Sequence, residues 1–561
     1  MRQAMIFGFI FLLLTACAPE VPAPQTLNAS ATAVIPTTLT ATATSPPATP
    51  IPTPTVTPTP IPTTTAVPAT PLPTATVPPT DIPLPNPTSP PAPTVTPADP
   101  NILCSNITDL PQAECEALVV LYNVLFAGYR LDWSQFSSPC SWQRPAPDSL
   151  IICENGHVTQ IYVTFSYITQ LPAEISDLTQ LTVLDLNIHA LSTLPPEIGQ
   201  LTNLRRLELQ FGNIHELPQE LAQLPNLEEL NLAQNKLQEV PNSILALPNL
   251  RELNLHTNQI SRLPLAIDNL TNLQILHLQE NLLQSLPPEF GNLVALEFLN
   301  LSNNNLQALP DEFGNLAQLN RLSLGPSAVP MQLPNTLGNL HNLQTLGLRN
   351  MGLTTVPNEI FTLPNLHWLI LTDNELQTLP AEINTLTTLV RLDVRDNQLT
   401  ELPPTIGELL ALQELDLSIN QIHDLPAEMA NLVNLRELDY SQNGVTELSE
   451  ALFVIPGLHS LNLSGNELSQ VPPQIGMMTT LQTLLLSNNQ LQTLPPEIGQ
   501  LQNLSLFSLS SNPLQSLPAE MANLTNLMEL KLQFIDSLRL SSNLCQALAD
   551  VIRSSTVCRT D

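Results

Sequence analysis

Basic side chains are scarce in this 561-residue sequence, where 17 lysines and arginines stand against 49 aspartates and glutamates, giving a formal charge of −32. A surface this acidic repels phosphate backbones, which argues against nucleic acid as a partner. Catalytic motifs are missing as well. The sequence has no phosphate-binding glycine loop, no GxSxG elbow and no HExxH helix, and its nine histidines are scattered. We therefore expect no enzymatic activity, no catalytic residue and no cofactor.

A membrane-spanning hydrophobic run is also missing. The apolar stretch AMIFGFIFLLL after Arg2 has about eleven residues, too few to cross a bilayer of about 30 Å as a helix. It continues into Leu14-Thr15-Ala16-Cys17, and the whole segment resembles a bacterial lipoprotein signal whose terminal cysteine becomes lipidated. We expect residues 1–16 to be removed and Cys17 to anchor the chain outside the cytoplasm, on a bacterial membrane or cell surface. The alternative is secretory cleavage after Ala18, which the following proline disfavours.

Residues 17–100 have few charged side chains and consist almost entirely of Pro, Thr, Ala, Val, Ser, Ile and Leu. Proline at this density removes hydrogen-bond donors and favours extended polyproline II, so no packed core can form. This composition predicts a disordered stalk. Its threonines permit O-glycosylation.

A 23-residue repeat dominates the rest of the chain. Leu-Pro or Val-Pro recurs every 23 residues from Leu171 to Leu309, then after one interval of 24 at Leu333, and every 23 again to Leu517, with Leu448-Ser449 as the one break. Each unit continues as LxxLxLxxN, and seventeen units start between Val158 and Leu527. The alternating leucines are typical of a short half-buried strand, and Leu-Pro-x-Glu-Ile indicates a turn that opens a short helical segment.

One such unit cannot bury its leucines, but stacked units share a continuous core. The repeat resembles the 23-residue LPxEIGxLxxLxxLxLxxNxLxx class of the leucine-rich repeat family, over about 380 residues. The resemblance implies an α/β solenoid, a horseshoe with a parallel β-sheet on its concave face and a cap at each end. The expected divisions after the stalk are an N-terminal disulfide cap at 101–157, the repeats at 158–540 and a C-terminal cap helix at 541–561.

An asparagine closes the strand motif in eleven units, where its amide can satisfy backbone groups of neighbouring units. Two consecutive units replace it with Ser327 and Met351, which bracket the extra residue in GPSAVPMQLP. We predict a local break in the strand ladder there, with that loop bulging; the alternative is a repeat decayed by drift. Ten units place a glutamate three residues after the leucine of Leu-Pro, where a carboxylate suits the start of a short helix.

The cysteines support an exported protein. Six remain after Cys17, all outside the regular repeats, and sequence neighbours could pair, although fifteen connectivities are possible. No zinc-site spacing occurs among them. The segment from DLPQAECEALVVLYNVLF to HVTQIYV resembles the N-terminal cap of plant-type extracellular leucine-rich repeat proteins, and SSNLCQALADVIRSSTVC predicts a closing helix. The six candidates for disulfides are Cys104, Cys115, Cys140, Cys153, Cys545 and Cys558.

Function must come from side chains between the strand leucines, which point out of the inner face. Most are small or polar. One group of three consecutive units differs, because exposed Trp and Arg together are typical of protein-binding surfaces. The alternative is that isolated apolar residues on a surface are ordinary and that the arginines only balance nearby acidic residues. The candidate ligand-binding patch is Arg349, Trp368, Ile370, Arg391, Asp393 and Arg395.

A second group, Glu252, His256 and His277, lies on adjacent predicted strands, where a shared metal is geometrically possible, but ordinary polar surface is the expected role and we predict no metal site. The leading hypothesis is a monomeric, surface-tethered module that binds a protein ligand on its inner face. The alternative is a structural envelope or cell-contact protein in which the solenoid is a spacer or an adhesion element.

Overall fold

The structure is a computed structural model. All the residues that it describes belong to the second of two compact units, residues 91–561. The predicted signal peptide, Cys17, nearly the whole stalk, Cys140 and Cys558 lie outside the described residues. The described ranges are 99–105, 107–125, 149–164, 168–326, 331–535 and 538–548.

The repeats form one open sheet of eighteen strands. β1 pairs antiparallel with β2, and every later pair from β2 to β18 is parallel and sequential. The predicted solenoid with a parallel sheet is therefore confirmed. Its strands are β1 Ser149–Glu154, β2 His157–Thr164, β3 Val183–Asn187, β4 Arg206–Glu208, β5 Glu229–Asn231, β6 Glu252–Asn254, β7 Ile275–His277, β8 Phe298–Asn300, β9 Arg321–Leu324, β10 Thr345–Leu348, β11 Trp368–Ile370, β12 Arg391–Asp393, β13 Glu414–Asp416, β14 Glu437–Asp439, β15 Ser460–Asn462, β16 Thr483–Leu485, β17 Leu506–Ser508 and β18 Glu529–Lys531.

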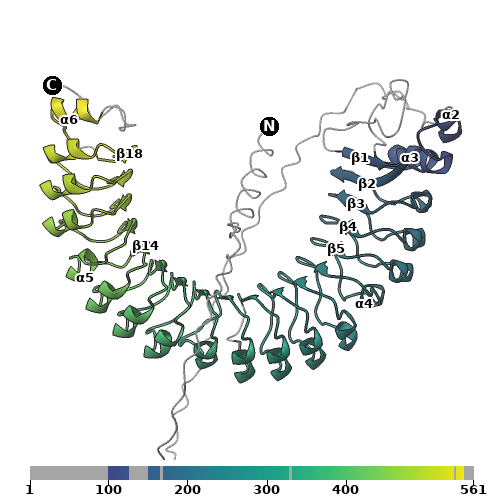
Figure 1. Cartoon of the computed structure of the whole chain (residues 1–561), viewed down its shortest axis with the longest axis horizontal. Helices are drawn as coiled ribbons and strands as arrows, with labels where there is room; N and C mark the ends of the chain where they lie inside the picture. Colours follow the sequence, from purple (N-terminus) through teal and green to yellow (C-terminus); the bar gives the residue numbers. More distant parts are fainter. Residues whose placement is uncertain are drawn as a thin grey trace, which may run out of the picture. The chain divides into compact units, whose positions relative to one another are not determined.

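From β2 onward, a short helix follows each strand on the other side of the repeat array. Figure 1 shows the strands side by side along the inner side of the curved array and the helices along its outer side. Most are 3-10 helices: η3 Ala173–Asp177, η4 Pro196–Gln200, η5 Gln219–Gln223, η6 Leu265–Asn269, η7 Pro288–Asn292, η8 Asp311–Asn315, η9 Asn335–Asn339, η10 Asn358–Thr362, η11 Ala381–Thr385, η12 Pro404–Glu408, η13 Ala427–Asn431, η14 Pro473–Met477, η15 Pro496–Gln500 and η16 Ala519–Asn523. The α-helices are α2 Pro100–Cys104, α3 Gln112–Leu125, α4 Asn242–Leu245, α5 Glu450–Phe453 and α6 Ser542–Ala547.

The core lies between these two layers and runs through all repeats. In the sixth strand's unit, Leu250, Leu253 and Leu255 are at most 1% exposed, and Ile267 from the following helix is equally buried. Each unit repeats this arrangement, so each leucine packs against the same leucine of its neighbours. Among the described residues, no helix combines the length and the apolar character that a membrane crossing needs.

The recurring asparagine forms the predicted ladder. Asn281 is 4% exposed, its side-chain amide donates to the carbonyls of Leu255 at 2.9 Å and Leu278 at 3.1 Å, and its oxygen accepts the Ile260 N–H at 2.9 Å. All eleven asparagines at this slot are buried. Where His189 replaces asparagine, its ring accepts the Leu191 N–H and reaches the Leu209 carbonyl at 3.1 Å, and burial lowers the pKa of this imidazole.

The predicted break in the ladder is wrong. β9 and β10 pair over four residues, from Arg321↔Thr345 to Leu324↔Leu348, with an offset of 24 instead of 23. The extra residue is absorbed after β9, beyond the paired residues, so the strands keep their register. Residues 327–330 lie outside the described part, so the predicted bulge of that loop cannot be compared.

The glutamates of Leu-Pro-x-Glu do not cap the short helices. Glu197 and Glu497 lie in the first turn of η4 and η15, but in both helices the N-cap is proline and no side chain makes a capping hydrogen bond. One carboxylate oxygen of Glu497, and one of Glu289 in the first turn of η7, is buried without a partner among the described residues. The reason is that a five-residue 3-10 helix satisfies its own turn: the Ile198 N–H already donates to the Pro195 carbonyl at 3.1 Å.

The N-terminal cap covers the exposed edge of the core. Cys104 on α2 and Cys115 on α3 form a disulfide. Glu114 on α3 is buried and accepts the Val158 N–H at 2.9 Å and a hydrogen bond from the His157 ring at 2.6 Å, which joins α3 to β2. At the other end α6 lies after the last repeat.

Cys153 and Cys545 are also disulfide-bonded. The remaining two cysteines, Cys140 and Cys558, and the residues after Leu548 lie outside the described part. The predicted connectivity therefore has one pair that the structure describes in full, Cys104 with Cys115.

Candidate functional site

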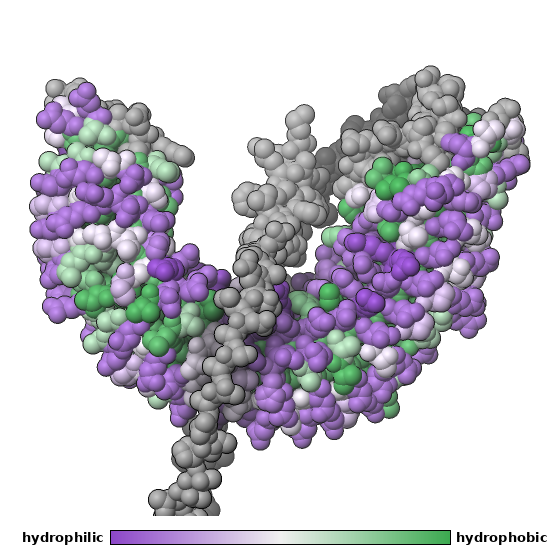
Figure 2. Space-filling view, in the orientation of Figure 1, coloured by the Kyte–Doolittle hydropathy of each residue, from purple (hydrophilic) through white to green (hydrophobic). Residues whose placement is uncertain are grey.

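Three inner-face slots recur in every repeat, two on the strand and one just after it. In the unit of β11 they hold Trp368, Ile370 and Thr372. The parallel register places Trp368 next to Arg391 and Ile370 next to Asp393 on β12. Neighbouring strands lie about 4.8 Å apart, so each slot forms a row of side chains across the sheet. Figure 2 shows that the visible surface is mostly hydrophilic, with hydrophobic side chains in small separate groups.

A shallow hollow of about 530 Å³ opens on this inner face between β8 and β12. We call it the concave hollow. The units of β8 to β10 contribute Ser302, Ser323, Leu324 and Gly347 to its lining. Its remaining lining residues are Arg349, Ile370, Thr372, Asp393 and Arg395.

The concave hollow lies where Gly347 interrupts a row of side chains. Gly347 occupies the second slot of its unit, where the neighbouring units carry Ser323 and Ile370. Gly325 occupies the third slot, between those of Ser302 and Arg349. A Cβ at Gly347 would meet nothing closer than Ser323 Oγ at 3.5 Å. A Cβ at Gly325, in contrast, would lie 2.1 Å from the Arg349 carbonyl oxygen, so the open space belongs to Gly347. Leu324, which otherwise belongs to the core and is 1% exposed, lines the hollow.

Arg349 is exposed but already paired. Its guanidinium contacts Asp373 through both Nε and Nη2, each at 2.7 Å. Partial burial would raise the pKa of Asp373, but the hydrogen bonds from Arg349 and from Asp396 hold that pKa below its usual value. The same contact with Asp373 raises the pKa of Asp396. Arg349, which lines the concave hollow, is therefore held in place by this carboxyl pair.

Asp393 and Arg391 are also engaged by the scaffold. Asp393 is 8% exposed, and its Oδ1 accepts hydrogen bonds from Thr372 Oγ1 at 2.9 Å and from the Arg395 N–H at 3.1 Å. Arg391 lies 3.2 Å from a Glu414 carboxylate oxygen and 3.9 Å from Asp393. These two side chains hold the surface in shape.

Arg395 is different. Its side chain is exposed, and within the described part of the chain its guanidinium makes neither a hydrogen bond nor an ion pair of 4 Å or less. The hydroxyls of Ser302 and Ser323, both half-buried in the concave hollow, likewise donate to no described residue. The hollow therefore presents one guanidinium and two hydroxyls that are available to a ligand.

The six predicted patch residues are thus only partly brought together. Arg349, Ile370, Asp393 and Arg395 line the concave hollow, whereas half-buried Trp368 and Arg391 lie in the adjacent first-slot row. The sequence interpretation missed the residues that create the hollow. The available signal was Gly347 between two strand leucines, at a slot where most units carry a polar side chain.

A row of carboxylates adjoins the concave hollow. Asp393, Asp416 and Asp439 stand next to each other in the second slots of β12 to β14, and Glu414 and Glu437 occupy the first slots of β13 and β14. We call Glu414, Asp416, Glu437 and Asp439 the acidic ladder. Burial raises the pKa of Asp416, hydrogen bonds from Ser418 oppose this, and the charges of Asp393 and Asp439 raise it further.

The second predicted group does not converge. Among the described residues, no three His, Cys, Asp or Glu side chains are placed to hold a metal ion. The His277 ring packs 4.8 Å from the Phe298 ring, and His256 Nδ1 lies 2.8 Å from Thr257 Oγ1. Burial, with a smaller contribution from His256, lowers the pKa of His277 to about 4. These rings are therefore neutral parts of the inner surface at pH 7.

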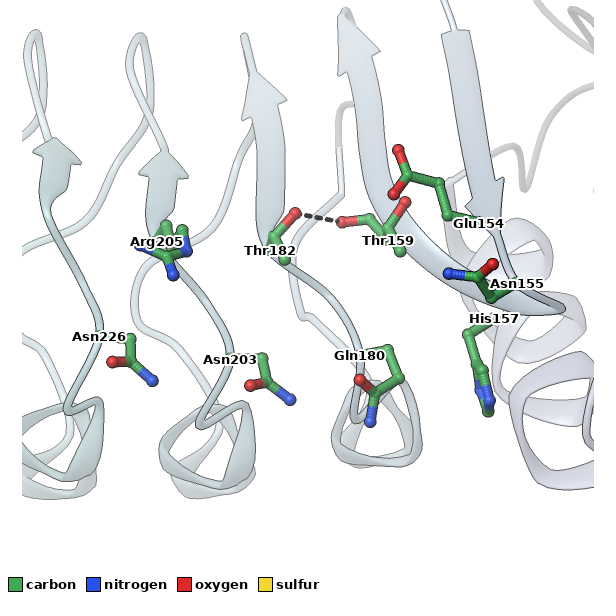
Figure 3. A pocket seen from close by; sticks show the side chains of 9 residues that line it. All are labelled: Glu154, Asn155, His157, Thr159, Gln180, Thr182, Asn203, Arg205 and Asn226. Atoms are coloured by element: carbon green, nitrogen blue, oxygen red, sulfur yellow. Dashed lines mark hydrogen bonds between the residues drawn. The ribbon is translucent and has the colours of Figure 1, made fainter.

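Another hollow of about 510 Å³ lies at the edge of the sheet beside the N-terminal cap (Figure 3). Its polar groups are mostly used within the scaffold. Thr182 donates to the Thr159 carbonyl at 2.9 Å, and Asn203 donates to the Thr179 carbonyl at 2.9 Å. Its two potential cations are paired as well, Arg205 with Glu228 and His157 with Glu114. Unlike the concave hollow, this edge hollow therefore has no cation among its described lining residues that lacks a partner.

Comparisons with known proteins agree with the repeat architecture. Models of the leucine-rich repeat region match residues 242–333, 267–351 and 331–455, and further leucine-rich repeat models match 202–260, 457–478 and 480–501. A search of curated protein sequences gave no match.

Among solved structures, a leucine-rich repeat protein of Leptospira interrogans is 32% identical over 70% of this chain and 94% of its own, with a TM-score of 0.48. The Toll–Spatzle complex of Drosophila is 28% identical over 66% of this chain and 53% of the matched one, with a TM-score of 0.58. The functional domain of InlJ from Listeria monocytogenes is 20% identical over 66% of this chain and 72% of its own, with a TM-score of 0.49. With its unbroken array of seventeen parallel strands and these matches, the chain belongs to the leucine-rich repeat family.

Proposed function

We propose that the chain is a monomeric, surface-tethered module that binds a protein ligand on its concave face around β9 to β14. The single observation that carries this proposal is the concave hollow, where Arg395 and two serine hydroxyls are available next to half-buried Trp368 and Ile370. Leucine-rich repeat solenoids are commonly protein-binding modules, and the matched Toll structure is a complex with Spatzle. An isolated spacer would have no need for a hollow with unpaired polar groups.

The experiment compares capture of partners by two variants of the full-length protein. One variant combines Trp368→Ala, Arg391→Ala and Arg395→Ala. Its matched control combines Ser460→Ala, Thr483→Ala and Ser487→Ala, the same three slots on β15 and β16. Each protein is incubated with intact cells, cross-linked and analysed by quantitative mass spectrometry, with circular dichroism as the check on folding.

We expect the wild type and the matched control to enrich the same proteins, and the first variant to lose them. A hot-spot side chain contributes about 2 kcal/mol or more to binding, so loss of two or three should reduce capture by more than tenfold. Equal capture by all three proteins would favour the spacer or adhesion role instead.

The tether is part of the proposal. Cys17, in Leu14-Thr15-Ala16-Cys17, is proposed as the lipid attachment site, and residues 17–100 as the stalk that holds the repeats away from the membrane. A chain of about 80 residues in polyproline II reaches roughly 250 Å. The disulfide between Cys104 and Cys115 supports placement in an oxidising compartment outside the cytoplasm.

Lipid attachment is tested by growing cells with an alkyne analogue of a fatty acid. The wild-type protein should carry the label and sediment with membranes, and Cys17→Ser should lose both properties. Unlabelled wild-type protein cut after Ala18 would show ordinary secretion and contradict the tether.

A further inference from the structure

The concave hollow and the acidic ladder lie side by side and have opposite chemical preferences. On one side, Arg321 on β9 and Arg395 are exposed and form no ion pair with described residues. Asp373 pairs with Arg349 there, and the Asp393 carboxylate in the hollow already accepts two hydrogen bonds. On the other side, the acidic ladder on β13 and β14 has four carboxylates, and the strand residues themselves supply no cation there. The inner face therefore changes sign within a few strands.

The concave hollow suits a carboxylate. A guanidinium recognises carboxylate oxygens with directed, charge-assisted hydrogen bonds, and serine hydroxyls can add further donors. Arg395, Ser302 and Ser323 are the groups available for this contact. Ile370 and Leu324 beside them can cover the methylene groups of an acidic side chain.

The acidic ladder suits cations. In-register like charges on neighbouring strands destabilise a sheet, and the ladder has such pairs at both slots, Glu414 with Glu437 and Asp416 with Asp439. Hydrogen bonds from Ser418 and Ser441 satisfy one oxygen each of the two aspartates. Asn462 donates to the second oxygen of Asp439 at 2.9 Å, so Glu437 and the second oxygen of Asp416 are the acceptors without a described partner. Arg391 reaches one of the four carboxylates, Glu414.

The distance between the concave hollow and the acidic ladder sets the spacing between the side chains of a ligand that contacts both. Gly347 in the concave hollow lies on β10 and Asp416 lies on β13, so three strand spacings separate them, about 14 Å. An extended chain advances about 3.5 Å per residue and covers this distance in about four residues.

We propose, on the basis of the function proposed above, that the ligand contributes an extended segment that crosses the strands with one acidic side chain in the concave hollow and basic side chains about four residues away on the acidic ladder. Charge complementarity selects this occupant over a uniformly acidic or uniformly basic segment. A uniformly acidic segment is repelled by the ladder, and a uniformly basic one leaves Arg395 unsatisfied.

The test uses fluorescein-labelled ten-residue peptides of serine, glycine and alanine, and the full-length protein at low ionic strength. The probe peptide has glutamate at its third position and lysine at its seventh and eighth. One control peptide replaces the glutamate with glutamine, and another moves the lysines next to the glutamate. We expect each control to bind about tenfold more weakly than the probe, measured by fluorescence polarisation.

Protein variants locate the binding. Gly347→Leu should fill the concave hollow without strain, because a Cβ there meets Ser323 Oγ at 3.5 Å, an ordinary contact. Asp416→Asn with Glu437→Gln removes two charges of the acidic ladder and keeps the oxygen that accepts from Ser418. Each should weaken probe binding about tenfold. Thr483→Leu, which adds the same side chain on β16, two strands beyond the acidic ladder, should leave probe binding unchanged.

Two results would overturn the inference. The first is equal binding of the glutamine peptide and the probe, which would mean that the acidic ladder attracts lysines without help from the concave hollow. The second is unchanged probe binding by Gly347→Leu. Absence of probe binding also overturns the inference. If the probe does not bind but the triple alanine variant loses its captured partners, the proposed function is still supported. If the triple alanine variant captures its partners unchanged, both the proposed function and this inference are contradicted.

Discussion

The asparagine ladder gives a direct measure of what holds neighbouring repeats together, and Asn281→Ala is the sharpest test of it. The substitution removes the oxygen that accepts the Ile260 N–H at 2.9 Å, which no other group replaces. A buried donor left without a partner costs about 1–3 kcal/mol.

The two hydrogen bonds that the Asn281 amide donates contribute less to the unfolding free energy. Leu255 O also accepts from Asn258 at 3.1 Å, and Leu278 O also accepts from Asn304 at 2.9 Å, so each carbonyl keeps one partner. Losing the second bond to each costs about 0.5 kcal/mol, the low end for a hydrogen bond. The expected loss in unfolding free energy is therefore about 2–4 kcal/mol.

The matched control is Asn272→Ala in the same repeat. Asn272 also donates to a backbone carbonyl, that of Pro248 at 2.9 Å, but it is exposed, so water replaces the bond. We expect a loss below about 1 kcal/mol. Guanidinium unfolding followed by circular dichroism gives the free energies, and hydrogen exchange at the Ile260 amide shows whether the effect is local. Equal losses for the two variants would refute the account of the ladder.

Three further changes test single features of the fold. Gly407→Ala should lower the unfolding free energy by about 1–3 kcal/mol in a denaturant titration, because its Cβ would lie 2.3 Å from the Glu428 carbonyl oxygen; a neutral result would contradict the packing of η12 on η13. Ile419→Asn should raise it by about 1 kcal/mol, because Ile419 has a φ of 54°, which asparagine adopts more easily than a β-branched residue; no gain would show that the turn is unstrained. Burial, and then the charge of Glu208, raises the pKa of Asp185 from 3.8 to about 6, equivalent to about 3 kcal/mol and reduced by solvent screening to about 1. The charged carboxylate thus destabilises the folded protein above pH 6, so Asp185→Asn should gain about 1 kcal/mol at pH 7 and lose that gain as pH falls from 6 to 4; a gain independent of pH would contradict this origin.

The sequence predicts the scaffold well because each repeat states the same local rules. Alternating leucines set the strand, proline sets the start of the helix, and the asparagine sets the turn. Leu253, Pro264 and Asn258 therefore behave as their counterparts in the other units do. Parallel register then follows from the period. The 24-residue interval misled the prediction because period alone does not show where in a unit an extra residue is absorbed.

The site is less predictable because it depends on what is missing and on contacts across units. Gly347 opens the concave hollow by having no side chain, next to Ser323 and Ile370 of the neighbouring units. The roles of the arginines depend on neighbours in adjacent repeats: Asp373 binds Arg349, whereas the Arg395 guanidinium makes no hydrogen bond or close ion pair in the described part of the chain. The sequence shows the three arginines of the predicted patch, and the structure shows that Arg395 is the one whose guanidinium has no close partner among the described residues.

The claim that matters most is that the inner face from β9 to β14 receives the ligand. Hydrogen–deuterium exchange of the full-length protein, with and without the partner captured from cells, tests it directly. Amides in the third-slot turns after β9 to β14, among them Arg349 and Arg395, should exchange more slowly in the complex, while η8 to η13 on the outer side stay unchanged. Slower exchange on the outer helices with no change on the inner face would contradict the account.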